Sequence, residues 1–184
     1  KDFNNLLVPF RAVASDVFNK NSIVLSKGDL GDAVRASMSF PFVFRPIMID
    51  SIIAYDGGIY DNFPVDVMVN DFHPDFIIGS LVAVAPGEHK VEIPDEFDLM
   101  GQVTSMIIQK SDYSLDPSLG VKVEFDLTSV GLLDFHLIDE VSALGYRNTM
   151  LLMDSIKSRT TARRDTSVVQ KRREEFKTRI PRLY

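Results

Sequence analysis

The stretch IIAYDGGIYDNFPVD, residues 52–66, joins two apolar runs through Asp56-Gly57-Gly58. Asp-Gly between apolar runs is a strong hairpin signal, so local chemistry predicts a turn here. Alternatively, the aspartate is held at the end of a strand to move a proton. The two interpretations are compatible, because a turn can present a carboxylate. Glycines without a Cβ also let the backbone turn sharply and let a neighbouring loop approach closely.

The elements around this stretch predict an α/β fold. Residues 51–55 suit a strand that ends at Asp-Gly-Gly, and residues 63–71 suit a helix with Pro64 in its first turn. Residues 75–86 are apolar enough for a buried strand. The order strand, turn, helix, strand is typical of an α/β sheet with crossover connections.

Both flanks supply further elements. Towards the N-terminus, residues 6–17 and 22–26 suit two strands, one of them buried on both faces. Asp29 as a cap and Asp32 in the first turn predict a short helix within residues 28–41 that Pro41 stops. Towards the C-terminus, periodicity predicts helices over 94–110 and 138–157 and a strand over 120–127.

Length and composition set outer limits. A chain of 184 residues with 45% hydrophobic residues fits one globular domain with a sizeable core. It begins with Lys1 and looks like a piece cut from a longer protein. The absence of cysteine excludes disulfides and thiolate metal sites. Gly28 and Gly31 lack the third glycine of a dinucleotide-binding loop, and we expect no cofactor.

Charge is unevenly distributed. Residues 1–156 carry 10 Lys and Arg against 23 Asp and Glu, whereas residues 157–184 carry 10 against 3. The basic tail could contact nucleic acid or anionic lipid, or form a solvated helix. We favour the solvated helix and expect no nucleic-acid binding. RREE places positive and negative charges within one helical turn, and the tail has no aromatic residue before Phe176.

Candidate nucleophiles and metal ligands are few. A Gly-x-Ser-x-Gly elbow is absent from the sequence. Ser37 and Ser39 lack flanking glycines and end a predicted helix, so we expect them to serve packing and capping. His73, His89 and His136 have no metal-ligand spacing, so no metal site is predicted. Apolar neighbours favour a structural role for His136.

Five segments carry a resemblance to a known family. In chain order, four of them resemble the second half of a bacterial patatin-like phospholipase domain: LVPFRAVASDV (7–17), LGDAVRASMSFPFVFRPIMID (30–50), YDGGIYDNFPVDV (55–67) and DFIIGSLVAV (75–84). FDLTSVGLLDFHLIDEVSALGY (125–146) is similar to the segment that closes that domain. The resemblance implies a patatin-like, α/β-hydrolase-related central sheet flanked by helices, with its N-terminal strands missing from this chain.

The resemblance also implies a Ser-Asp dyad, in which Asp56 heads the Asp-Gly-Gly motif and Gly57 and Gly58 are its glycines. Such an enzyme is a lipid acyl hydrolase, whose serine attacks a carboxylic ester of a phospholipid or related lipid while the aspartate accepts the proton. The serine elbow and the oxyanion loop belong to the missing N-terminal half. We therefore expect this chain alone to be inactive.

Four apolar residues are candidates for lining an acyl pocket: Phe40, Phe42, Val43 and Phe44. A role in the core is the stronger alternative for each. The resemblance implies a lipid or phospholipid ester as substrate, contact with a membrane surface, and the missing N-terminal half of the domain as a partner.

The predicted organisation is a C-terminal portion of a lipase domain at residues 1–156, followed by a basic helical tail or linker at 157–184 towards a following domain. RREEFKTRIPRLY (172–184) resembles the passage from lipase domain to periplasmic domain and outer-membrane barrel in some bacterial patatin-like proteins. This favours the periplasm, the outer membrane or secretion over the cytoplasm. The alternative is a non-catalytic lipid-binding or scaffold module beside an outer-membrane protein.

Overall fold

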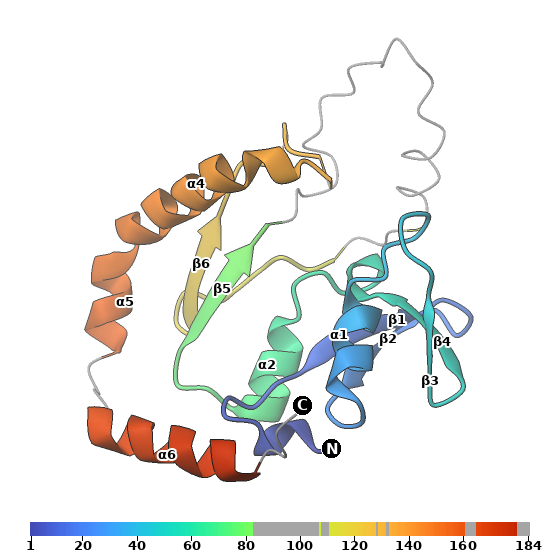
Figure 1. Ribbon diagram of the computed structural model, residues 1–184. Coiled ribbons are helices and arrows are strands. Elements are labelled where there is room, and N and C mark those ends of the chain that lie inside the picture. The colour runs from blue at the N-terminus through green and yellow to red at the C-terminus, as the bar shows by residue number, and fades with distance from the viewer. Residues whose placement is uncertain (83–106, 108–110, 128, 132, 161–164, 180–184) are drawn as a thin grey trace. The chain divides into compact units, whose positions relative to one another are not determined.

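The computed structural model describes residues 1–82, 107, 111–127, 129–131, 133–160 and 165–179 (Figure 1). The chain divides into two compact units, Lys1–Gly57 with Thr161–Tyr184, and Gly58–Thr160. Apart from Ile107, the helix predicted over 94–110 lies outside the described residues. None of the helices in the described ranges has both the length and the apolar character needed to cross a bilayer.

The first unit is built on a four-stranded antiparallel sheet with the order β2-β1-β4-β3. Its strands are β1 (Ala12–Asp16), β2 (Asn21–Leu25), β3 (Ile47–Ile49) and β4 (Ile52–Asp56). Strand β1 is buried on both faces, as predicted, and four of its five residues are less than 5% exposed. The strands predicted within 6–17, 22–26 and 51–55 are therefore confirmed, whereas β3 was not predicted.

Helix α1 (Leu30–Ser37) packs on this sheet and contacts β1, β3 and β4 (Figure 1). The Asp29 side chain accepts a hydrogen bond from the Asp32 N–H at 3.1 Å, which confirms the predicted cap. The helix ends at Ser37, before Pro41. Its inner face meets the sheet through three fully buried alanines: Ala36, Ala14 and Ala54. Small side chains here let the helix approach the strands closely.

A second cluster lies at the start of the chain. The short 3-10 helix η1 (Phe3–Asn5) places the Phe3 ring, 1% exposed, against Ala12 of β1 and Ala33 of α1. Phe10 packs at its edge, with ring centroids 6.1 Å apart. The N-terminal residues are thereby fixed to the same sheet.

The turn predicted at Asp56-Gly57-Gly58 is present between a strand and a helix, but it does not form the β-hairpin that Asp-Gly signals. After β4 the chain enters a 3-10 helix, η2 (Gly57–Ile59), and no strand folds back. Strand β4 already pairs with β1 on one side and β3 on the other, so a following strand has no free edge to join. The hairpin lies six residues earlier, where Asp50 and Ser51 join β3 to β4 with φ of 47° and 69°.

The second unit contains α2 (Val65–Phe72), with Pro64 at its N-cap, and a parallel pair, β5 (Ile77–Leu81) and β6 (Gly120–Glu124). The α/β class is confirmed, but β4 and β5 belong to different sheets, so α2 is not a crossover within one sheet. Strand β5 alternates buried and exposed residues, and Ile78 is 53% exposed. It is therefore buried on one face.

A helix was predicted over 138–157, and this stretch is helical but forms two helices instead of one. The 3-10 turn η3 (Phe135–Leu137) leads into α4 (Ile138–Leu151), which contacts β6, and α5 (Met153–Arg159) follows. Leu152 separates the two helices: its φ and ψ of −95° and 0° stay in the right-handed helical region, and its N–H bonds to the Thr149 carbonyl at 3.1 Å in a tightened last turn. In the tail, α6 (Thr166–Arg179) is almost wholly exposed, which agrees with a solvated helix.

Candidate functional site

Asp56 is the last residue of β4 and is half-buried. It lies opposite Ala14 of β1, while the pairing with β3 extends only to Ala54. Its backbone N–H donates to the Ser39 carbonyl at 3.1 Å, just beyond the end of α1. The position of Asp56 is therefore fixed by the sheet and by the helix that covers it.

The space around Gly57 is too small for any residue with a Cβ. A Cβ built on it would lie 2.5 Å from the Val13 carbonyl oxygen and 2.8 Å from the Val13 carbonyl carbon, which are backbone atoms of β1. The Ser15 hydroxyl, fully buried, donates to the Gly57 carbonyl at 3.4 Å. The sequence predicted a close approach at this glycine, and the approaching segment is a strand of the same sheet rather than a loop.

The two serines near α1 are engaged with the helix backbone. Ser37 Oγ donates to the Val34 carbonyl at 2.9 Å, and Ser39 Oγ donates to the Arg35 carbonyl at 2.7 Å. Ser39 is 1% exposed. The predicted packing and capping roles are confirmed. The backbone carbonyl of Ser39 also accepts the Asp56 N–H, and the sequence did not predict this second role. Every residue has such a carbonyl, so the residue type gives no signal for it.

In the second unit, the pKa of Asp61 is raised above its ordinary value. Burial is the main cause, the negative charge of Asp66 adds to it, and the hydrogen bond that Asp61 Oδ1 accepts from the Phe63 N–H at 3.3 Å opposes it. The next residue, Asn62, donates from its backbone N–H to Ser111 Oγ at 2.9 Å. Neither residue was singled out from the sequence.

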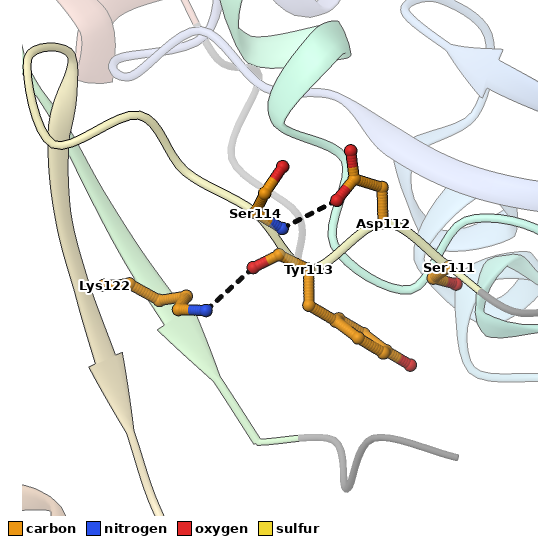
Figure 2. A pocket seen from close by; sticks show the side chains of 5 residues that line it. All are labelled: Ser111, Asp112, Tyr113, Ser114 and Lys122. Atoms are coloured by element: carbon orange, nitrogen blue, oxygen red, sulfur yellow. Dashed lines mark hydrogen bonds between the residues drawn. The ribbon is translucent and has the colours of Figure 1, made fainter. Parts of the chain in front are cut away.

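A hollow of about 540 Å³ lies in the same unit, and Figure 2 shows the five residues that line it: Ser111, Asp112, Tyr113, Ser114 and Lys122. Lys122 Nζ donates to the Tyr113 carbonyl at 2.9 Å and pairs with Glu124 Oε1 at 2.7 Å. Asp112 Oδ1 accepts from the Ser114 N–H at 2.9 Å. These polar groups bind one another, so they hold residues 111–114 in place rather than forming a charged ligand site.

The four candidate pocket residues divide by exposure. Phe40 is half-buried, whereas Phe42, Val43 and Phe44 are 54%, 41% and 46% exposed. The core role that the sequence favoured is therefore wrong for these three. Phe42 also has φ of 68°, a left-handed conformation that is a genuine outlier for a bulky residue.

In the described ranges, no group of three His, Cys, Asp or Glu side chains is arranged to hold a metal ion. His73 ends α2 with φ of 45°, and its Nδ1 lies 2.8 Å from the Val69 carbonyl. The side chain of His136 is 73% exposed, with Nδ1 3.9 Å from Asp134 Oδ1, so the predicted structural role in an apolar setting is wrong. His89 lies outside the described residues.

Residues 2–69 match the family model described as patatin-like phospholipase. This range holds β1, β4, α1 and the Asp56-Gly57-Gly58 motif. An uncharacterized NTE family protein of Mycobacterium tuberculosis is 38% identical over 60 residues, which cover 33% of this chain and 17% of that protein. The matches support a patatin-like phospholipase assignment.

A second relative extends the similarity along the chain. An uncharacterized NTE family protein of Mycobacterium bovis is 24% identical over 170 residues, which cover 78% of this chain and 29% of that protein. The chain therefore spans less than a third of the length of these curated relatives. Most of the patatin-like match, residues 2–57, lies in the unit that carries Asp56, and the match ends within α2 of the other unit.

Proposed function

We propose that the protein is a lipid acyl hydrolase and that Asp56 is the proton acceptor of a Ser-Asp dyad. The observation that carries the proposal is the placement of Asp56. It ends an inner strand of the patatin-like sheet, and its backbone is tied to Ser39 and to β1. A general base must be held within hydrogen-bond reach of the group that it deprotonates, and such anchoring limits its movement.

The serine of the dyad lies outside these 184 residues in this proposal, on a Gly-x-Ser-x-Gly elbow next to a glycine-rich oxyanion loop. As its oxygen bonds to the ester carbonyl carbon, its proton passes to Asp56 and the negative charge moves to the carbonyl oxygen. Collapse breaks the ester C–O bond, and the leaving alcohol takes the proton from Asp56. Water then hydrolyses the acyl-enzyme, with Asp56 again accepting a proton.

The substrate in this proposal is a phospholipid or related lipid ester at a membrane surface. Phe40, Phe42, Val43 and Phe44 contact its acyl chains. Gly57 and Gly58 complete the motif, and the close approach of Val13 to Gly57 supports the need for glycine there. Residues 1–156 form the C-terminal part of the lipase domain, and 157–184 connect it to a following domain.

Asp56→Asn in the full-length protein tests the proposal. Loss of the base should lower turnover of a phospholipid ester by about 10²–10⁴-fold and lower labelling by a fluorophosphonate probe. Asp50→Asn is the matched control, since Asp50 is an exposed aspartate in the β3–β4 turn of the same sheet, and it should keep wild-type turnover. Equal labelling and turnover in Asp56→Asn would overturn the assignment.

A second candidate function is a non-catalytic lipid-binding or scaffold module beside an outer-membrane protein. It is supported by the exposure of the apolar residues Phe42, Val43 and Phe44. A full-length protein that binds lipid vesicles but neither reacts with the probe nor turns over ester would favour this function.

A further inference from the structure

Asp56 lies where the hydrogen-bonded pairing of β4 comes to an end. The register with β3 stops at Ala54, and the register with β1 stops at Asp56 itself. Backbone groups at the end of a strand have fewer partners than those in its middle, so they open more readily. A general base needs a fixed position, and at this point bonds from outside the paired strands must supply it.

Two buried serines supply these bonds, and we call Ser15 and Ser39 the serine pair. The Ser39 carbonyl accepts the Asp56 N–H at 3.1 Å, where β3 no longer pairs with β4. The Ser15 hydroxyl donates to the Gly57 carbonyl at 3.4 Å, one residue beyond the last pair with β1. Both serines are fully buried, so water does not compete for either bond. The serine pair therefore holds the backbone before and after the Asp56 side chain.

Ser39 is itself held by the last turn of α1. Its Oγ donates to the Arg35 carbonyl at 2.7 Å, and its N–H donates to the Ala36 carbonyl at 3.1 Å. The last carbonyls of a helix lack the amide partners that a continuing helix would provide, and Ser39 supplies donors to two of them. Loss of the Ser39 hydroxyl would loosen the residue whose carbonyl accepts the Asp56 N–H.

The two hydroxyl groups are not needed to fill space. The neighbouring core is built from alanines, since Ala14, Ala36 and Ala54 are all fully buried. Serine differs from alanine by one oxygen, and a buried hydroxyl costs free energy unless it is hydrogen-bonded. The bonds described above are therefore what serine adds at both positions.

We propose that the serine pair positions Asp56 for proton transfer. Because side chains alternate along a strand, the Asp56 side chain shares a face of the sheet with Ala14, whereas Ser15 points to the opposite face. The serine pair acts through the backbone of the motif, so its members are positioning residues rather than catalytic residues. The inference rests on the proposed function and adds the residues that fix the place of its base.

The test is steady-state hydrolysis of p-nitrophenyl butyrate by the full-length protein. Ser39→Ala should lower kcat by about tenfold to a hundredfold with little change in KM, because a displaced base weakens the transition state rather than substrate binding. Ser15→Ala should lower kcat by a smaller factor, since its bond is longer. Neither change should lower kcat further in an Asp56→Asn background, because no carboxylate then remains to be positioned.

Ser37→Ala is the matched control. Ser37 Oγ donates to the Val34 carbonyl at 2.9 Å, so its removal weakens the same end of α1 while the Ser39 bonds remain. This variant should keep the wild-type kcat, with all rates measured below the melting temperature of each variant.

An equal loss of kcat in Ser37→Ala, or a further loss from either serine change in the Asp56→Asn background, would overturn the positioning role. Wild-type kcat in both serine variants, together with a loss in Asp56→Asn, would overturn the positioning role and leave the proposed hydrolysis intact. Wild-type kcat in Asp56→Asn itself would instead overturn the proposed dyad, and the positioning role with it.

Discussion

Gly57 leaves no room for a side chain at the end of the candidate site. Because a Cβ would lie 2.5 Å from the Val13 carbonyl oxygen, Gly57→Ala must push β1 and β4 apart. We expect it to lower the free energy of unfolding by about 1–3 kcal/mol, measured by urea denaturation.

Gly145→Ala provides the matched control. Gly145 lies inside α4, and an added Cβ would meet the Phe125 ring at an ordinary 3.6 Å. This change should raise the free energy of unfolding by about 0.5–1 kcal/mol, because alanine favours the helix. If Gly57→Ala proved as stable as the wild type, the close approach of β1 could not be the reason for glycine in the motif.

Asp16 and Asp61 should affect stability with opposite dependence on pH. The pKa of Asp16 is lowered, first by the Asn19 N–H and then by the Asn19 side-chain amide and the Phe18 N–H, against the cost of desolvation. Its stabilising contribution is therefore present above the unfolded pKa of about 3.9 and is lost as pH falls through the lower folded pKa. Asp16→Asn should destabilise the protein at pH 7 and flatten its acid denaturation.

The raised pKa of Asp61 gives the opposite dependence of stability on pH. Its burial and the Asp66 charge favour the protonated form in the folded state, so stability decreases as pH rises through the folded pKa. Asp61→Asn should raise the melting temperature at pH 7, and the gain should vanish below the unfolded pKa. Thermal melts of both variants across this range check the pair, and the same sign for the two variants would contradict it.

The β3–β4 hairpin is the strained connection of the four-stranded sheet. Asp50 and Ser51 both adopt positive φ, and a two-residue turn of this kind favours glycine at its second position. Ser51→Gly should raise the free energy of unfolding by about 1 kcal/mol, because it removes the Cβ penalty at φ of 69°. Ser51→Ala keeps that penalty and should show no gain in the same denaturation experiment.

This hairpin also shows where local patterns mislead. The Asp-Gly rule placed the reversal at Asp56-Gly57, because it cannot see that both edges of β4 are occupied by β1 and β3. Other local features were predicted correctly. The cap at Asp29 and the helix after Pro64 depend on contacts within a few residues, and both are present. The interruption at Leu152 carries neither glycine nor proline and so left no signal.

The candidate site, too, could be predicted only in part from the sequence. The motif identified Asp56 and Gly57 because their residue types carry the chemistry. The atoms that hold them are the Ser39 and Val13 backbone carbonyls, which any residue supplies. The exposure of Phe42 and Phe44 could not be predicted from the sequence either. Phenylalanine is typical of a core, and only the fold places these two side chains at the surface.

For the chain as a whole, charge and length constrain the function. The tail helix α6 exposes both signs and pairs Glu174 with Lys177 at 3.0 Å, so its basic residues are partly neutralised within the helix. A solvated connecting helix accounts for this pattern without nucleic acid. The candidate base, in contrast, lies inside the patatin-like match, and the chain spans less than a third of the relatives compared with it.

The proposed dyad therefore predicts where a covalent probe will react. Full-length protein labelled with a fluorophosphonate should carry the label on one serine outside residues 1–184, because this sequence has no Gly-x-Ser-x-Gly elbow. Ser15 and Ser39 are buried and donate to backbone carbonyls, so neither presents a free nucleophile. Peptide mapping by mass spectrometry reads the site directly. A label on a serine within residues 1–184 would mean that Asp56 serves a different nucleophile or none.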